Sequence, residues 1–338
     1  MTNNFLNGIA YTNTGDERRA TMHGYHGKPS PLNHSKTPYT ADVIGLKPMQ
    51  RRHAILTEGG VHESKFTIGF EVEKNVLHRG AVKEYPLFCG FERDGSCGYE
   101  AVTHILPLLP EGKWRNKVYD LFLQAEKIID SRYSPADRRC GGHVTISVKG
   151  KTSDEMRKAL RPLSGIILAL YESRISNGYC NGNLRMQPMS ERSSHFDGPN
   201  NRGGERYKMA LEKRVGHNEW VLEYRIPSKF ESVKQTMRRY ELFYALLDFA
   251  FNVSRVTHEK FLAHIRPIVL SMYGGDVAKT EQKLQKARHY RKFIMEGKID
   301  EEVLHFLDPY GRHPEMHTVQ VTGGRVVGHY NHDIENPF

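Results

Sequence analysis

Three short segments of this sequence alternate apolar and polar residues, which is the pattern of β-strands with one buried face. The first, FTIGFEVE at 66–73, places Glu71 and Glu73 on the face opposite its four apolar side chains. Two such carboxylates lie about 7 Å apart along a strand, since each residue rises roughly 3.3 Å. They repel each other unless a cation lies beside them, but for this segment alone a solvated face is the simpler interpretation.

The other two segments add polar groups that suit the same kind of site. In GHVTISV at 142–148 the polar face carries His143, and in WVLEYRI at 220–226 it carries Glu223 and Arg225. Each is common alone, and a lone strand histidine is usually structural. If the three strands share one sheet, with helices on the apolar side, these groups gather on the other side. Mg²⁺ prefers carboxylate oxygens and arginine pairs with phosphate, so the set predicts a magnesium and phosphate site.

Composition excludes several classes of protein. The chain has 338 residues, 38% of them hydrophobic and 10% aromatic, which excludes a disordered or fibrous protein. No apolar stretch reaches the roughly 20 residues that cross a bilayer, and the N-terminus lacks the pattern of a signal peptide. We therefore expect no membrane segment, a cytoplasmic location and four reduced cysteines.

The pattern of the sequence divides the chain into three expected parts. Residues 1–62 are rich in Gly, Pro, His, Asn and Thr without a period, which favours an irregular arm. Residues 63–270 form the main domain, and residues 271–338 form an appendage that ends in a hairpin at 318–330. Apolar periodicity predicts helices at 116–132, 153–175, 232–259 and 280–296.

Six short motifs follow one another between residues 66 and 229. They are GFEVE at 69–73, DGS at 94–96 followed by Glu100, CGGHVTI at 140–146, SRISNGYC at 173–180, RYKMAL at 206–211 and LEYR at 222–225. Their order resembles that of the amidoligases, a branch of the glutamine-synthetase-like carboxylate-amine ligases. The resemblance implies an α+β fold, in which a curved, mainly antiparallel sheet has helices packed on one face.

The same resemblance implies an activity and a set of site residues. An ATP-dependent ligase would convert a carboxylate into an acyl phosphate, and an amine would then displace phosphate to leave an amide. Two or more divalent ions, Mg²⁺ or Mn²⁺, would be held by Glu71, Glu73, Glu100, His143 and Glu223. Beside the catalytic Glu223, Arg225 and Arg206 would contact the transferred phosphoryl group, with Arg174 and Asn177 on the substrate and nucleotide side.

Two positions depart from the pattern of that family. Thr145 stands where many amidoligases carry a second histidine after the His-Val pair, and no asparagine follows Arg206 and Tyr207. The departures put one metal or substrate contact and the nucleotide side of the site in doubt.

Three other functions are compatible with parts of the sequence. A zinc site is conceivable from Cys140, His143 and two of Cys89, Cys97 and Cys180. An inactive scaffold or a nucleic-acid-binding protein would use a basic helix that contains Lys279, Lys283, Lys286, Arg288, Arg291 and Lys292 with Tyr290 and Phe293. A kinase-like or nucleotidyl-transfer enzyme would use the same metal site.

These motifs do not identify the substrates or the partners of the protein. The carboxylate and amine substrates would be small molecules or peptides, and free amino acids, polyamines, peptide or protein ends, cell-wall precursors and modified nucleobases all stay open. The formal net charge of +10 favours an anionic substrate or nucleic acid. Assembly into a homo-oligomer stays open.

Overall fold

The computed structural model describes residues 65–78, 87–94, 97–103, 106–137, 139–174, 210–216 and 219–296, together with short strands near both ends of the chain. The chain divides into two compact units. The first unit comprises Met1–Thr152, Arg214–Glu223 and Lys229–Tyr244, and the second comprises Ser153–Lys213, Tyr224–Ser228 and Ala245–Phe338. Helices and an antiparallel sheet are combined, which confirms the α+β class at this level.

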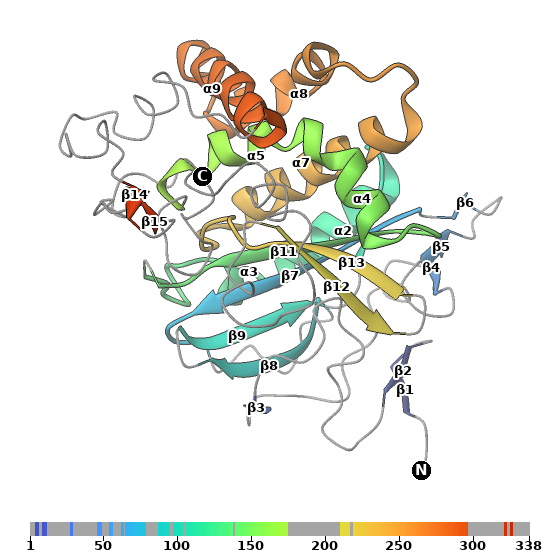
Figure 1. Cartoon of the computed structure of the whole chain (residues 1–338). Helices are drawn as coiled ribbons and strands as arrows, with labels where there is room; N and C mark the ends of the chain where they lie inside the picture. The colour runs from blue at the N-terminus through green and yellow to red at the C-terminus, as the bar shows by residue number, and fades with distance from the viewer. Residues whose placement is uncertain are drawn as a thin grey trace. The chain divides into compact units, whose positions relative to one another are not determined.

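An open sheet, most of which belongs to the first unit, is the frame of the fold (Figure 1). Its strands lie in the order β12-β13-β11-β7-β9-β8-β3, with β10 also paired to β7. Their bounds are β3 Lys28–Pro29, β7 Phe66–Lys74, β8 Phe88–Asp94, β9 Gly98–Thr103, β10 Leu106–Pro107, β11 Gly142–Val148, β12 Ala210–Gly216 and β13 Glu219–Tyr224. β7 is antiparallel to both β11 and β9.

The three predicted strands are β7, β11 and β13, and they are neighbours in the sheet. This confirms that their polar residues belong to one sheet. The turn predicted at 94–96 falls between β8 and β9, where Asp94 pairs with Gly98, but Gly95 and Ser96 lie outside the described residues. Sequence reasoning found the turn and treated its surroundings as a loop, so the two flanking strands were missed.

Smaller strand pairs occur outside the main sheet. In the N-terminal part, β1 (Asn4–Leu6) pairs with β2 (Ile9–Tyr11), and β4 (Leu46–Pro48), β5 (Ala54–Leu56) and β6 (His62–Glu63) form a three-stranded sheet. Near the C-terminus, β14 (Val321–Thr322) pairs with β15 (Arg325–Val326). This antiparallel pair falls within the hairpin predicted at 318–330, and the other residues of that hairpin lie outside the described residues.

Helices of the first unit cover the apolar face of β7. They are α2 (Lys113–Gln124), α3 (Glu126–Ile129) and the first part of α7 (Val233–Asn252). The Phe70 ring of β7 packs edge-on against Phe122 of α2 at 5.9 Å and against Phe230 at 5.7 Å. Tyr240 of α7 packs on Phe122 at 6.1 Å and donates its hydroxyl proton to the Pro107 carbonyl oxygen. The alternation of apolar residues in β7 therefore fixes which face receives the helices.

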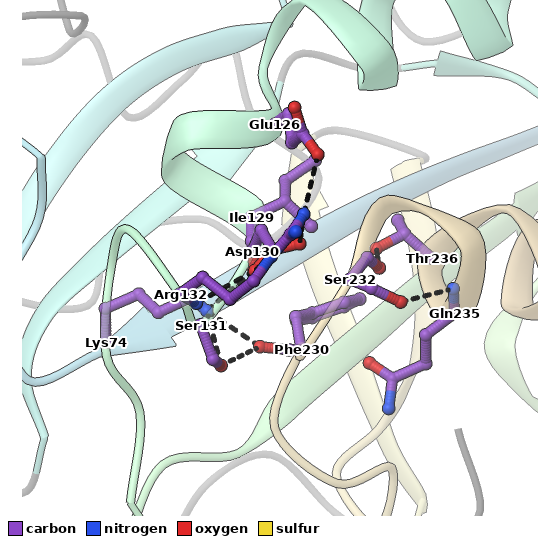
Figure 2. A network of polar contacts seen from close by, with 10 residues as sticks. All are labelled: Lys74, Glu126, Ile129, Asp130, Ser131, Arg132, Phe230, Ser232, Gln235 and Thr236. Carbon is purple, nitrogen blue, oxygen red and sulfur yellow. Dashed lines mark hydrogen bonds and ion pairs between the residues drawn. The ribbon is translucent and has the colours of Figure 1, made fainter.

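Lys74 ends β7 on that apolar face, and its side chain is fully buried. Its ammonium group donates to the carbonyl oxygens of Ile129 and Phe230, both at 2.7 Å, and to the Ser131 hydroxyl at 3.3 Å (Figure 2). Burial lowers the pKa of Lys74 to about 7. One cation thus connects the end of β7, the end of α3 and the segment that precedes α7.

The second unit consists mainly of helices. They are α4 (Ser153–Leu160), α5 (Gly165–Leu170), α8 (His258–Met272), α9 (Val277–Glu296) and the end of α7, with the 3₁₀ turns η3 (Arg161–Leu163) and η4 (Glu172–Arg174). The helix predicted at 153–175 is broken at Pro162, because proline cannot donate the next backbone hydrogen bond. The helix predicted at 232–259 ends at Asn252, and α8, which the sequence reading missed, begins after the cap residue Thr257.

A buried ion-pair cluster ties α9 to η4 within this unit. Glu172 accepts hydrogen bonds from Lys283 at 2.7 Å, from Lys286 at 2.8 Å and from the Tyr290 hydroxyl at 3.1 Å. The start of α5 also approaches α9 closely, since a Cβ on Gly165 would lie 2.8 Å from the Arg291 backbone nitrogen. Within the described residues, no helix is long and apolar enough to cross a membrane.

Removal of the Lys74 ammonium group tests its structural role. Lys74→Met keeps most of the side-chain length but leaves the buried Ile129 carbonyl without this donor. We expect the free energy of unfolding to fall by about 1–3 kcal/mol, as measured by urea denaturation. Equal or higher stability of the variant would show that the cost of burying the charge exceeds the gain from its hydrogen bonds.

His258 at the start of α8 makes the stability of the protein sensitive to acid. Burial lowers its pKa from 6.5 to about 4, and the charge of Arg291 acts in the same direction. Between these two values the unfolded chain binds more protons, so stability falls as the pH drops, by at most about 1.4 kcal/mol per pH unit. The stability advantage of wild type over His258→Gln should therefore shrink between pH 6.5 and pH 4. Denaturation curves across this range measure it, and a constant difference would contradict the assignment.

Candidate metal centre

Four neighbouring strands bring together the carboxylates and the imidazole that the sequence analysis selected. Strands β13, β11, β7 and β9 carry, in this order, Glu223, His143, the pair Glu71 and Glu73, and Glu100. His143 lies directly opposite Glu71, and Glu100 lies directly opposite Glu73. Opposed residues of antiparallel strands project from the same face with Cβ atoms about 5 Å apart. The strand register therefore draws these side chains together.

The face of the sheet that carries these residues is buried. Glu71 and Glu223 are 0% exposed, Glu100 2%, His143 3% and Glu73 5%. The interpretation of Glu71 and Glu73 as a solvated pair is therefore wrong. Neighbouring carboxylates repel one another more strongly away from water, so such a group favours a nearby positive charge.

The His143 ring lies close to three of the carboxylates. Its Nδ1 atom lies 2.6 Å from Glu71 Oε2 and 3.9 Å from Glu223 Oε1, and its Nε2 atom lies 3.4 Å from Glu73 Oε1. Single ligand atoms of Glu71, Glu73, Glu100 and His143 all lie within 4.8 Å of one another. We call these four residues the Glu/His cluster, and Glu223 lies beside it.

The Glu/His cluster has the chemistry of a divalent-cation site. Carboxylate oxygens are preferred ligands of Mg²⁺ and Mn²⁺. The spread of 4.8 Å between ligand atoms is close to the distance of about 4.2 Å between opposite ligands of an ion with bonds of about 2.1 Å. If the imidazole proton is on Nδ1, donated to Glu71, then Nε2 of His143 is left as a ligand atom. The residues present therefore fit a bound cation.

The zinc alternative receives no support from the described residues. The cluster that the structure forms there contains no cysteine. The Cys140 thiol donates to Asn75 Oδ1 at 3.3 Å, and burial raises the pKa of Cys140 to about 11. Zinc is bound by thiolate, and in this structure the Cys140 sulfur is instead engaged by the Asn75 side chain. Cys180 and the side chain of Cys89 lie outside the described residues.

The remaining predicted site residues fall outside the first unit or outside the described chain. Arg174 in η4 and Arg225 just after β13 are buried residues of the second unit. Arg206 and Asn177 lie outside the described residues. The phosphate and substrate contacts of these four residues therefore stay predictions.

Two features near the cluster were missed by the sequence analysis. The backbone N–H of Gly141 donates to Glu73 Oε2, and Asn75 holds the turn that precedes Gly141. The doubled glycine in CGGHVTI was the available signal for a backbone contact of this kind. Thr145, the departure from the family pattern, is buried opposite Gly69, so a hydroxyl group stands there in place of an imidazole.

Comparisons with known proteins do not assign the chain to a family. A scan against protein-family models finds no match, and a search of curated proteins finds none either.

Substitution of one cluster carboxylate tests cation binding directly. Glu100→Gln preserves shape while removing a negative charge from the Glu/His cluster. We expect Mn²⁺ to raise the melting temperature of the wild type and to have little effect on this variant, since a ligand that binds only the folded state stabilises it. The metal-free variant should be at least as stable as wild type, because one buried like charge is gone.

Glu126→Gln is the matched control for this measurement. Glu126 lies in the same unit but outside the cluster, in an exposed pair with Arg132 at 3.0 Å. This control should keep the full response to Mn²⁺ in differential scanning fluorimetry. An equal response of Glu100→Gln and wild type would remove Glu100 from the site.

Proposed function

We propose that this protein is an ATP-dependent carboxylate-amine ligase with a glutamine-synthetase-like catalytic domain. In the proposed reaction, a substrate carboxylate oxygen bonds to the γ-phosphorus of ATP and ADP leaves. The amine nitrogen then bonds to the carbonyl carbon, phosphate leaves and the nitrogen gives up a proton. The products are an amide, ADP and phosphate.

The observation that carries the proposal is the Glu/His cluster itself. Its four residues belong to motifs that the sequence analysis found in the order typical of amidoligases, and they are buried within 4.8 Å of one another. If Glu-x-Glu and His-Val occurred here by chance, we would not expect their side chains to lie together in the folded protein. The first unit thus supplies carboxylates of the kind that hold a divalent cation, and such a cation can in turn bind the oxygens of a polyphosphate.

Residues of this chain would share the work as follows. Glu71, Glu73, Glu100, His143 and Glu223 would hold Mg²⁺ or Mn²⁺, with Glu223 beside the cluster. The bound cation would supply charge neutralisation for the ATP phosphates. The Glu71 carboxylate holds the His143 ring through its Nδ1 atom, which fixes the direction of the other ring nitrogen.

The roles proposed for the arginines rest on the resemblance to the amidoligases. Arg225 and Arg206 would contact the phosphoryl group in transfer, because a guanidinium matches phosphate oxygens. Arg174 and Asn177 would lie on the substrate and nucleotide side.

The ion pairs made by the basic helix α9 weaken the nucleic-acid alternative. Lys283 and Lys286 both pair with Glu172, and the exposed fraction of Lys286 is 3%. Arg288 pairs with Glu259 at 2.8 Å. These three cations neutralise carboxylates of their own unit, so they do not form one solvated basic face.

The function is tested by phosphate release from ATP with Mg²⁺, in the presence and absence of pooled amines and carboxylic acids. Mass spectrometry then seeks a product lighter by one water than the joined substrates. Glu73→Gln and Glu223→Gln should each lower turnover at least about 100-fold, since loss of metal-held charge stabilisation costs several kcal/mol. Glu126→Gln should turn over as wild type does.

Two results would contradict the proposal. Turnover that is unchanged in both Glu73→Gln and Glu223→Gln would place the chemistry elsewhere. No binding of ATP with Mg²⁺ by calorimetry, even with substrates added, would favour an inactive scaffold.

A further inference from the structure

The two oxygens of the Glu73 carboxylate have different partners. Oε2 accepts a hydrogen bond from the backbone N–H of Gly141. Oε1 faces the Glu/His cluster, 3.4 Å from His143 Nε2. A carboxylate held by one oxygen has a fixed rotamer, so Gly141 determines where the other oxygen points.

The position of Gly141 depends on the turn that leads into β11. Asn75, two residues after Glu73, makes four hydrogen bonds to this turn. Its backbone N–H donates to the Pro135 carbonyl and its side-chain N–H donates to Asp137 Oδ2, both at 2.8 Å. Its Oδ1 accepts from the Asp137 backbone N–H at 2.8 Å and from the Cys140 thiol at 3.3 Å.

Asn75 and its partner Asp137 are themselves held in place. A Cβ on Gly98 of β9 would lie 2.6 Å from the Asn75 carbonyl oxygen, and Gly98 has a φ of +104°, so glycine is required at this close approach. Arg139 pairs with Asp137 at 2.8 Å and holds the pKa of that carboxyl at about 2. Asp137 therefore remains an ionised acceptor at neutral pH.

We propose that Asn75 is a positioning residue for the metal site, acting through the turn and the Gly141 N–H to orient the Glu73 carboxylate. The inference rests on the metal site of the proposed function. Asn75 is not one of the four residues of the Glu/His cluster. It fixes the second oxygen of one ligand, as groups around a metal commonly do.

The physical argument concerns preorganisation of the ligand. A carboxylate that is free to rotate must be ordered when the cation binds, and this costs side-chain entropy. The Asn75 contacts order it beforehand through main-chain groups. Loss of such outer contacts typically lowers metal affinity 10–100-fold.

Mn²⁺ affinity of the full-length protein is the first measurement, by titration calorimetry or by electron paramagnetic resonance of free Mn²⁺. Asn75→Ala should bind Mn²⁺ about 10–100-fold more weakly than wild type. In the metal-free protein, the amide proton of Gly141 should move upfield in the ¹H–¹⁵N spectrum, since its hydrogen bond to Glu73 is weakened.

A reciprocal pair of substitutions separates this role from a general loss of stability. Asn75→Asp places a second carboxylate beside that of Asp137 and should weaken Mn²⁺ binding. Adding Asp137→Asn exchanges the two groups, so that an amide again donates to a carboxylate. Affinity should then recover above that of Asn75→Asp, although the ion pair with Arg139 is lost. This pair also carries the test if Asn75→Ala does not fold.

Tyr119→Phe is the control for stability. It removes one hydrogen bond of 2.8 Å to Glu241, in the same unit but within its helices. Its Mn²⁺ affinity should equal that of wild type.

The outcomes distinguish the inference from the function on which it rests. Wild-type affinity in Asn75→Ala, or no recovery in the reciprocal pair, would overturn the role of Asn75 and leave the metal site standing. A wild type that binds no Mn²⁺ would overturn the metal site and the inference together.

Discussion

Burial of both faces of β7 is the constraint on which the first unit depends. Every one of its nine residues is buried, with aromatic rings packed against helices on one side and Glu71 and Glu73 on the other. A strand in this position cannot slip by one residue, because a slip would exchange the two faces and place carboxylates among the aromatic rings. The pairings of β7 with β11 and β9 follow from that fixed orientation, and they bring His143 and Glu100 to the two glutamates.

Buried charged side chains have different kinds of partners in different parts of this chain. Lys74 is surrounded by carbonyl oxygens, and Glu172 by two ammonium groups and a hydroxyl. Both clusters join separate segments within one unit, and both neutralise or solvate a charge through protein groups. The Glu/His cluster instead collects three carboxylates around one imidazole. This set of oxygen and nitrogen ligand atoms is the reason why we propose a cation for this cluster and a structural role for the other two.

The sequence predicted three of the eight strands of the main sheet and most of the cluster. The period-two pattern gave β7, β11 and the core of β13, and it assigned their polar faces correctly. Glu100 entered only through the family resemblance, because its strand was read as part of a loop. The prediction of one long helix at 153–175 was wrong at Pro162. The apolar periodicity continues through this position, but proline lacks the N–H that would continue the α-helical hydrogen bonds. Lys74 was missed although it continues the apolar register of β7, a position where a lysine signals a buried partner.

The sequence by itself determined which side chains share a face, because alternation along a strand is a local property of the backbone. Only the tertiary structure decided the strand order, the register that sets His143 opposite Glu71 and Glu100 opposite Glu73, and the burial of that polar face. The tertiary structure also decided the hydrogen bonds from Gly141 to Glu73 and from Asn75 to Asp137. They join residues more than 60 positions apart, and no local pattern records which distant backbone group will meet a given carboxylate.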